Sequence, residues 1–261
     1  MTEAGCRGRV RVACSCPTLV VLATSLAFAV PASATPAVTL KVAPLPILGF
    51  PGTGNIAGAG AEVEAEVTIS GSEYGGYPSP LTELTFYAPA GVRLSTTGFV
   101  TCAPAVLEAS GAAGCPERSR AGPRGEGLGV VAFGGEPVPE KVSIQPFFIP
   151  AGGLAFYVEG HTPASFDILE KGYWTMASAP FGLKLIAEVP LVETVPGANY
   201  ASILSFKVKV GAAYKQGKKT VSYITLPKRC PRGGAPVKAE LKFLSGEVVT
   251  VTYHAPCARR R

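Results

Sequence analysis

Proline and glycine interrupt this chain so often that no apolar stretch after residue 34 reaches the length of a three-turn amphipathic helix. The sequence contains 24 prolines and 31 glycines, and they are spread along its whole length. Proline lacks a backbone donor and glycine loses much conformational freedom on folding, so both end regular helices. Short apolar runs between turn residues are typical of strands. The sequence therefore predicts an all-β fold, with one short turn of helix in the segment CAPAVLEAS at 102–110.

The clearest strand pattern lies near the C-terminus, where apolar and polar residues alternate. Every second residue from 237 to 243 is apolar, Ser245-Gly246 supplies a turn, and the alternation returns from 249 to 254. A period of two matches the pleat of a half-buried strand. About a dozen short strand candidates separated by turn signals favour a sandwich. We expect a disulfide-stapled antiparallel β-sandwich of Ig-like type.

Cysteine usage points to an oxidising compartment. Of the 7 cysteines, four follow residue 34, namely Cys102, Cys115, Cys230 and Cys257. Four cysteines allow three connectivities, which the sequence alone leaves open. We expect nearest neighbours to pair, because Cys102–Cys115 and Cys230–Cys257 would each close a short, turn-rich loop. A zinc site is disfavoured, since the spacings lack the two to four residues between ligands that are typical of metal knuckles.

Residues 1–34 have the layout of a secretory signal peptide. Arg7, Arg9 and Arg11 precede an apolar run at 18–30, and Ala32-Ser33-Ala34 forms a cleavage site of the A-x-A type. A membrane-spanning helix needs roughly 20 apolar residues, more than this run provides. We expect cleavage after residue 34 and a secreted, extracellular or cell-wall-associated chain with no transmembrane segment. Retention of the segment as an anchor is left open.

Two packed sandwiches are favoured over one continuous sandwich. Residues 35–137 would form the first domain, with the Cys102/Cys115 loop. Residues 138–261 would form the second, with the Cys230/Cys257 hairpin and a basic tail. Each half contains a cysteine pair that includes a Cys-Pro dipeptide, and this loose repetition supports the division.

Charge is distributed unevenly along the chain. Residues 35–199 contain 8 basic and 15 acidic residues, whereas residues 200–261 contain 13 basic and 2 acidic residues. A basic arm suits an anionic partner such as a wall polymer, and no nucleic acid is expected for an exported protein. Lys207, Lys209, Lys218 and Lys219 are the candidate polyanion contacts. The competing interpretation is that such lysines occupy solvent-facing strand positions and discourage aggregation.

Aromatic residues are concentrated between residues 156 and 174. Exposed aromatic rings form flat platforms for sugar faces or for protein partners. Tyr173 and Trp174 follow Lys171-Gly172 and are the candidates for such a ligand platform. The alternative is that these aromatic residues belong to the core.

Few residues are suited to catalysis. The chain has two histidines and a single aspartate, Asp167, and no G-x-S-x-G motif. Calcium loops are usually rich in Asp and Asn, which are scarce here. We therefore expect no enzyme activity, no cofactor and no metal. The alternative is a secreted hydrolase with a site around His161 and Asp167.

Several motifs combine strand, turn and cysteine signals. They are LTFYAPAG at 84–91, Gly98-Phe99 before Cys102, Cys115-Pro116, and the closing pattern Y-x-x-L-P-x-x-C-P, F-x-x-G and Y-x-x-P-C between Tyr223 and Cys257. This combination resembles uncharacterised secreted β-rich proteins of high-GC actinobacteria, over most of the chain after residue 34. The resemblance implies a secreted β fold and carries no reaction. We expect a non-catalytic, structural or adhesive protein that binds an anionic wall polymer, a glycan or an envelope protein.

Overall fold

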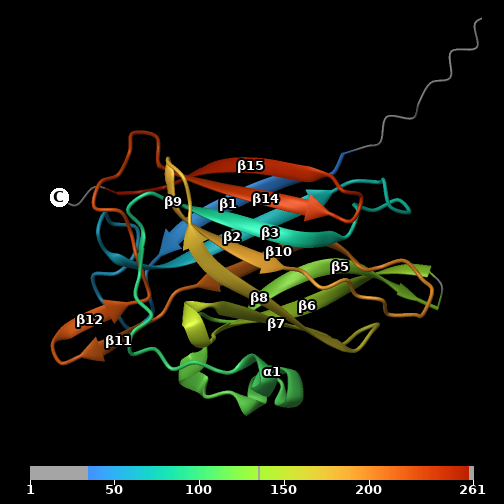
Figure 1. Cartoon of the computed structure of the whole chain (residues 1–261), viewed down its shortest axis with the longest axis horizontal. Coiled ribbons are helices and arrows are strands. Elements are labelled where there is room, and N and C mark those ends of the chain that lie inside the picture. The colour runs from blue at the N-terminus through green and yellow to red at the C-terminus, as the bar shows by residue number, and fades with distance from the viewer. Residues whose placement is uncertain (1–34, 135, 259–261) are drawn as a thin grey trace, which may run out of the picture. The chain divides into compact units, whose positions relative to one another are not determined.

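The computed structural model describes residues 35–134 and 136–258, in which strands dominate (Figure 1). The strands are β1 (Ala37–Leu45), β2 (Gly60–Ser70), β3 (Leu81–Pro89), β4 (Arg93–Leu94), β5 (Gly125–Phe133), β6 (Glu136–Phe148), β7 (Leu154–Gly160), β8 (Phe166–Met176), β9 (Phe181–Glu188), β10 (Ser202–Val210), β11 (Ala213–Gln216), β12 (Lys219–Ser222), β13 (Ile224–Thr225), β14 (Ala235–Phe243) and β15 (Val248–Ala255). One α-helix, α1 (Pro104–Ser110), and three single 3-10 turns, at Ala112–Gly114, Glu117–Ser119 and Pro150–Gly152, complete the described elements. The predicted all-β class is confirmed.

Thirteen of these strands form one hydrogen-bonded sheet in which every ladder is antiparallel. The order is β15-β14-β3-β9-β8-β7-β6-β5-β10-β2-β13-β4, and β1 pairs with β2. Strands β5 to β9 follow one another as a meander, because each is joined to the next by a short turn. In contrast, β3 lies between β9 and β14, which come much later in the chain. Strands β11 and β12 form a separate hairpin.

The sheet curls so that the edge strand β15 lies close to β1, the strand that pairs with β2. Apolar side chains from both edges pack into one cluster, which includes Leu40 and Val42 of β1 and Val251 of β15. In β14, the four residues predicted to face inward are each at most 3 % exposed. The alternation in the terminal hairpin therefore indicates the buried face correctly. The finer description as an Ig-like sandwich is compatible with this curled sheet and stays a prediction.

Helix α1 covers the outer face of the meander. Its Leu107 is 1 % exposed and packs with Phe147 of β6 and Tyr157 of β7. The helix begins with Pro104, whose missing N–H needs no partner at that position. It ends at Ser110 and is capped by Gly111, whose positive φ of 62° lets its N–H bond to the carbonyl oxygen of Leu107. The predicted short turn of helix in this segment is confirmed.

Two disulfides join Cys102 to Cys115 and Cys230 to Cys257. This is the nearest-neighbour pairing predicted from the sequence, and the disulfide-stapled architecture is confirmed. The first disulfide ties the start of α1 to the turn that follows it, and the second closes the terminal hairpin. Disulfides persist in oxidising environments, so the pairing indicates an extracellular or otherwise oxidising location.

The domain boundary expected at residues 137 and 138 lies inside β6. Pro137 and Val138 pair with Ala132 and Val131 of β5, and the strands on both sides of this position belong to the same sheet. The described residues belong to one compact unit.

The expected signal peptide, residues 1–34, lies outside the described residues. Among residues 35–134 and 136–258, no helix has the length and apolar character needed to cross a membrane.

Candidate functional site

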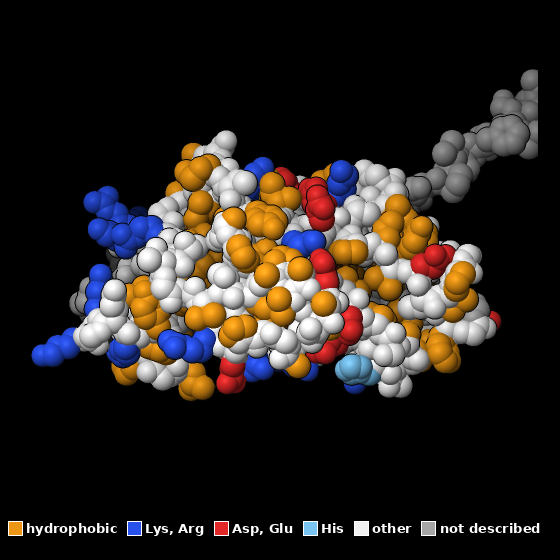
Figure 2. Space-filling view, turned by 60° about the horizontal axis from the view of Figure 1, so that its bottom comes forward, with side chains coloured by type: hydrophobic (Ala, Val, Ile, Leu, Met, Phe, Trp, Pro, Cys, Tyr) orange, Lys and Arg blue, Asp and Glu red, His pale blue; other side chains and the backbone are white. Residues whose placement is uncertain are grey.

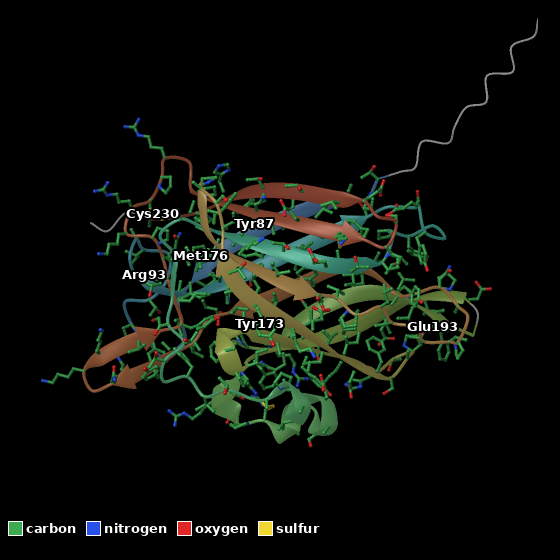
Figure 3. All side chains as sticks on the ribbon, in the orientation of Figure 1. Tyr87, Arg93, Tyr173, Met176, Glu193 and Cys230 are labelled. Carbon is green, nitrogen blue, oxygen red and sulfur yellow. A yellow bond between two sulfur atoms is a disulfide. The ribbon has the colours of Figure 1, made fainter. Side chains whose placement is uncertain are left out.

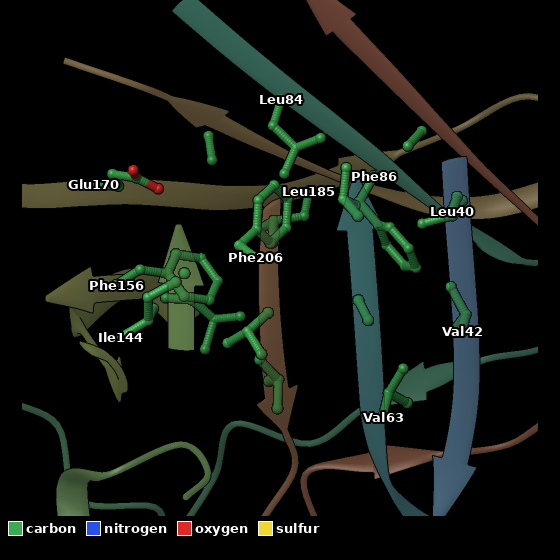
Figure 4. Close-up of a pocket in the computed structure, with 18 of the residues that line it drawn as sticks. Leu40, Val42, Val63, Leu84, Phe86, Ile144, Phe156, Glu170, Leu185 and Phe206 are labelled. Atoms are coloured by element: carbon green, nitrogen blue, oxygen red, sulfur yellow. The ribbon is translucent and has the colours of Figure 1, made fainter. Parts of the chain in front are cut away.

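The inner face of the curled sheet surrounds an apolar cavity of about 230 Å³, which we call the interior cavity. It is lined by inward-facing side chains from most strands of the sheet, β1, β2, β3, β5, β6, β7, β8, β9, β10 and β14 among them. Figure 4 shows Val42, Leu84, Ile144, Phe156 and Phe206 converging on this space from five strands. Because the lining residues come from distant parts of the sequence, the cavity exists only in the folded sheet.

Several large side chains that line the interior cavity are not fully buried, whereas others, such as Leu154, are. Leu84, Phe86, Phe156 and Phe206 face inward, yet each remains half-buried. A close-packed interior would bury such residues almost completely, since protein cores are packed as densely as organic crystals. Their remaining exposure therefore faces the cavity, and the inside of the sheet is hollow.

One carboxyl group in the interior cavity has no polar partner in the described part of the chain. Glu170 lies on the inward face of β8, directly opposite Phe156 of β7. No hydrogen bond or ion pair to its side chain is found within residues 35–134 and 136–258. Burial among apolar groups disfavours the charged form and raises the pKa of Glu170 from 4.5 to about 7. A carboxyl group that titrates near neutral pH is thus placed inside an apolar hollow.

The second carboxyl group of the lining, Glu140, is fully satisfied. Its Oε1 accepts hydrogen bonds from the backbone N–H groups of His161 and Thr162 at 3.1 and 3.0 Å, and its Oε2 accepts one from Ala164 at 3.0 Å. This side chain is 0 % exposed. Three backbone donors stabilise a carboxylate, so Glu140 holds the loop between β7 and β8 in place.

Among the described residues, no Lys, Arg or His side chain lines the interior cavity. Its charged groups are the two carboxyl groups, and Ser202 and Ser205 add small polar groups from the start of β10. Apart from these side chains, the indole of Trp174 and the disulfide-bonded Cys257, the walls are aliphatic or aromatic. The cavity is chemically suited to an apolar ligand, with Glu170 as the point that a polar group of the ligand would meet.

The two residues of the predicted aromatic platform point to opposite faces of β8. Trp174 lines the interior cavity, and its Nε1 donates a hydrogen bond to the hydroxyl of Tyr223 at 3.0 Å. Tyr173 is 45 % exposed on the outer face, where Figure 3 labels it. Successive residues of a strand alternate between faces. Tyr173 and Trp174 therefore do not form one surface.

The four candidate polyanion contacts lie in two different settings. Lys207 and Lys209 of β10 each form an ion pair with Glu64 of β2 at 3.5 Å. Lys218 and Lys219 lie exposed at the tip of the separate β11–β12 hairpin. The first pair shares the carboxylate of Glu64, which offsets part of its charge, whereas the second pair faces solvent.

Further basic residues accompany Lys218 and Lys219 at one end of the molecule. Figure 2 shows Lys and Arg side chains gathered at its left end, where Figure 1 places β11, β12 and the loop before β14. In Figure 3, basic side chains around the labelled Cys230 project away from the sheet. We define the basic end as the exposed residues Lys215, Lys218, Lys219, Lys228, Arg229 and Arg232. Ion pairs to these residues are absent from the described part of the chain.

The expected alternative, a hydrolase site around His161 and Asp167, has little geometry to support it. His161 lies exposed in the loop after β7, and Asp167 lies exposed on the outer face of β8. No hydrogen bond joins their side chains, both of which are described. Within the described ranges, no group of three or more His, Cys, Asp or Glu side chains is arranged to hold a metal ion.

Sequence reasoning missed Glu170 as a functional residue, although a signal for it was present. Residues 166, 168, 170, 172 and 174 occupy one face of β8, and this face is otherwise apolar or glycine. A single acid on the apolar face of an alternating strand indicates a buried carboxyl group. The sequence pattern alone does not reveal that this face closes around a hollow.

A scan against protein-family models found no match, and searches of curated proteins and of solved structures found no significant similarity.

Proposed function

We propose that this chain is an exported, non-catalytic binding protein that holds an apolar ligand in the interior cavity. One observation carries the proposal: a hollow of about 230 Å³ has an apolar lining in which several large side chains, such as Phe86, Phe156 and Phe206, remain half-buried. An apolar cavity of about 150 Å³ in another protein stays dry and takes up benzene, so a hollow of this size and chemistry can hold a small hydrocarbon. The disulfides and the sequence of residues 1–34 support export.

Ligand binding in the interior cavity can be measured by the intrinsic tryptophan fluorescence of the chain. Trp174 is the single tryptophan of the sequence and lines the interior cavity. Its fluorescence should change as 1-octanol, kept below its solubility limit, fills the cavity. A saturable change in Trp174 fluorescence that fits a single dissociation constant supports the proposal. A fluorescence spectrum that stays unchanged at all octanol concentrations overturns it.

A cavity-filling variant makes this experiment specific. Ala65 of β2 is a small, half-buried lining residue, and Ala65→Phe adds a ring to the hollow. We expect this variant to lose octanol binding while its circular dichroism spectrum stays that of the native protein. Thr68→Phe is the matched control, because Thr68 lies on the exposed face of the same strand. Equal octanol binding by both variants would contradict a ligand site inside the sheet.

A second candidate function is attachment to an anionic envelope polymer through the basic end. It is favoured by the six exposed basic residues on the β11–β12 hairpin and the loop around Cys230. Interactions between exposed charges are screened by salt, so this binding should fade between low and high ionic strength. The double variant Lys218→Glu/Lys219→Glu should weaken binding to isolated cell-wall polymer. The double variant Lys141→Glu/Lys242→Glu changes the net charge equally at other exposed sites and should not.

A further inference from the structure

We infer that the ligand of the interior cavity carries a basic amine, which binds as an ammonium group to the carboxylate of Glu170. This inference rests on the proposed function, because it requires that the cavity takes up a ligand. It adds the chemical class of that ligand, an apolar body with one cationic amine.

The geometry places the Glu170 carboxyl group within reach of any ligand in the hollow. The side chain projects from β8 toward the apolar side chains that surround the cavity (Figure 4). Its neighbours on the same face of β8 are Ile168 and Gly172, and Phe156 lies directly across from it on β7. None of these side chains offers a hydrogen bond or a charge.

Within residues 35–134 and 136–258, no titratable group balances Glu170. On β8 itself, Asp167 and Lys171 point to the opposite face. On the neighbouring strands the same holds for Glu159 of β7 and for Lys184 and Glu188 of β9, which alternate with the inward residues. The titratable side chain that shares the cavity with Glu170 is Glu140, which is occupied by three backbone N–H groups. Among the described residues, the Glu170 carboxyl group therefore has no charged partner in the cavity, whether it is ionised or protonated.

A cationic amine fits this environment better than the other polar groups that a small apolar molecule carries. Buried charges in proteins are normally paired, and a carboxylate in the ligand would meet only acids here. A hydroxyl group would give one neutral hydrogen bond, whereas an ammonium group would give a charge-assisted one, which is stronger. The ring of Phe156 beside Glu170 adds an aromatic face of the kind that attracts cations within about 6 Å.

The pH dependence of binding follows from the same arrangement. Desolvation raises the pKa of Glu170 to about 7, so the carboxylate is present mainly above that pH. An alkyl ammonium group keeps its proton up to about pH 10. Affinity for an amine should therefore rise from pH 5 to pH 8, by up to about a hundredfold if the amine pairs only with the ionised carboxylate.

The test uses three probes with the same apolar body: octylamine, 1-octanol and octanoate. Their dissociation constants are measured at pH 8 and pH 5, by Trp174 fluorescence and by calorimetry, on the full mature chain. At pH 8 we expect octylamine to bind about 10- to 100-fold more tightly than octanol, and octanoate to bind most weakly. Glu170→Gln should reduce octylamine affinity to that of octanol and remove its rise with pH. Glu188→Gln, on the outer face of β9, is the matched control and should behave as the native protein.

The outcomes separate this inference from the proposed function. If octanol or octanoate binds as tightly as octylamine, or if Glu170→Gln keeps the preference for octylamine, the amine assignment is overturned while the cavity remains a ligand site. If none of the three probes binds at either pH, both the amine assignment and the proposed function are overturned.

Discussion

The indole Nε1 of Trp174 donates a hydrogen bond to the hydroxyl of Tyr223 at 3.0 Å, and this bond joins β8 to the residue that precedes β13. Tyr223 is 1 % exposed, and burial raises the pKa of its hydroxyl to about 12. Its ring packs against Phe148 with 4.6 Å between centroids. The contact fixes the orientation of the tryptophan that lines the interior cavity.

Replacing Trp174 by Phe should lower the free energy of unfolding by about 1–3 kcal/mol, because the buried hydroxyl of Tyr223 loses its donor. Urea denaturation followed by circular dichroism measures this change. Tyr173→Phe, at the exposed neighbouring position, should change stability by less than about 0.5 kcal/mol. Equal effects of the two substitutions would show that the bond to Tyr223 contributes nothing.

Replacing Glu140 by Ala should destabilise the loop between β7 and β8, since three backbone N–H groups lose their acceptor. Each lost bond to a charged group costs roughly 1.5–3 kcal/mol, and water access at the exposed His161 and Thr162 reduces the sum to about 2–4 kcal/mol. Hydrogen exchange should accelerate at these two amides and at Ala164. Glu136→Ala, at the exposed start of the same strand, serves as the control and should leave that exchange unchanged.

Stability should fall as pH rises from about 4.5 to 7 because of Glu170. The pKa of this group in the folded protein is about 7, above its ordinary value of 4.5. The folded state therefore holds a proton that the unfolded state has already lost, and stability present below pH 4.5 is lost as pH approaches 7. The loss is on the order of 3 kcal/mol.

Glu170→Leu removes the titrating group and should abolish this part of the pH dependence. At pH 8 the variant should be more stable than the native protein, because an unpaired carboxylate has been replaced by an apolar side chain in an apolar hollow. Urea denaturation between pH 4 and pH 8 measures both effects. A native protein whose stability is flat over this range would contradict the environment assigned to Glu170.

Each disulfide should stabilise the fold by a similar amount. The linked cysteines are 13 and 27 residues apart, for which the chain-entropy model gives about 3 kcal/mol for Cys102–Cys115 and about 3.6 kcal/mol for Cys230–Cys257. Double Cys→Ser variants of each pair, compared by urea denaturation, measure these values. A loss well below about 1 kcal/mol in either variant would show that the corresponding loop is already constrained without its disulfide.

The sequence predicted the features that depend on neighbouring residues. The alternation of the terminal hairpin identified the buried residues of β14, and short turn-rich loops identified the partners of Cys102 and Cys230. Both are local properties, because strand period and loop length can be read within about 30 residues.

Local patterns could not decide between the exposed platform and the core for Trp174, because they do not show that the strand runs through Gly172. Strand β8 continues through Gly172 to Met176. A Cβ atom at Gly172 would lie 3.0 Å from Cδ1 of Leu185, so the glycine permits close approach of β9 rather than a turn.

The interior cavity could not be predicted, because it depends on which distant strands become neighbours. Strand β10 lies between β5 and β2, and β3 lies between β9 and β14. Alternation tells which face of a strand is apolar but not what the face meets. Glu170 becomes part of the cavity lining only because β7, β8 and β9 share that lining with β2 and β3.

The position of β3 has a consequence for how this chain acquires its fold. Its neighbours are β9 and β14, so one edge of β3 remains open until β9 (Phe181–Glu188) is available and the other until β14 (Ala235–Phe243) is available. Pairings between such distant segments require large loops to close first, and proteins dominated by them fold on the slow side of the known range. Until the last hairpin docks, β3 exposes unpaired backbone groups that invite association with other chains. The hairpin of β14 and β15 therefore determines how long this edge of β3 is at risk of pairing with other chains.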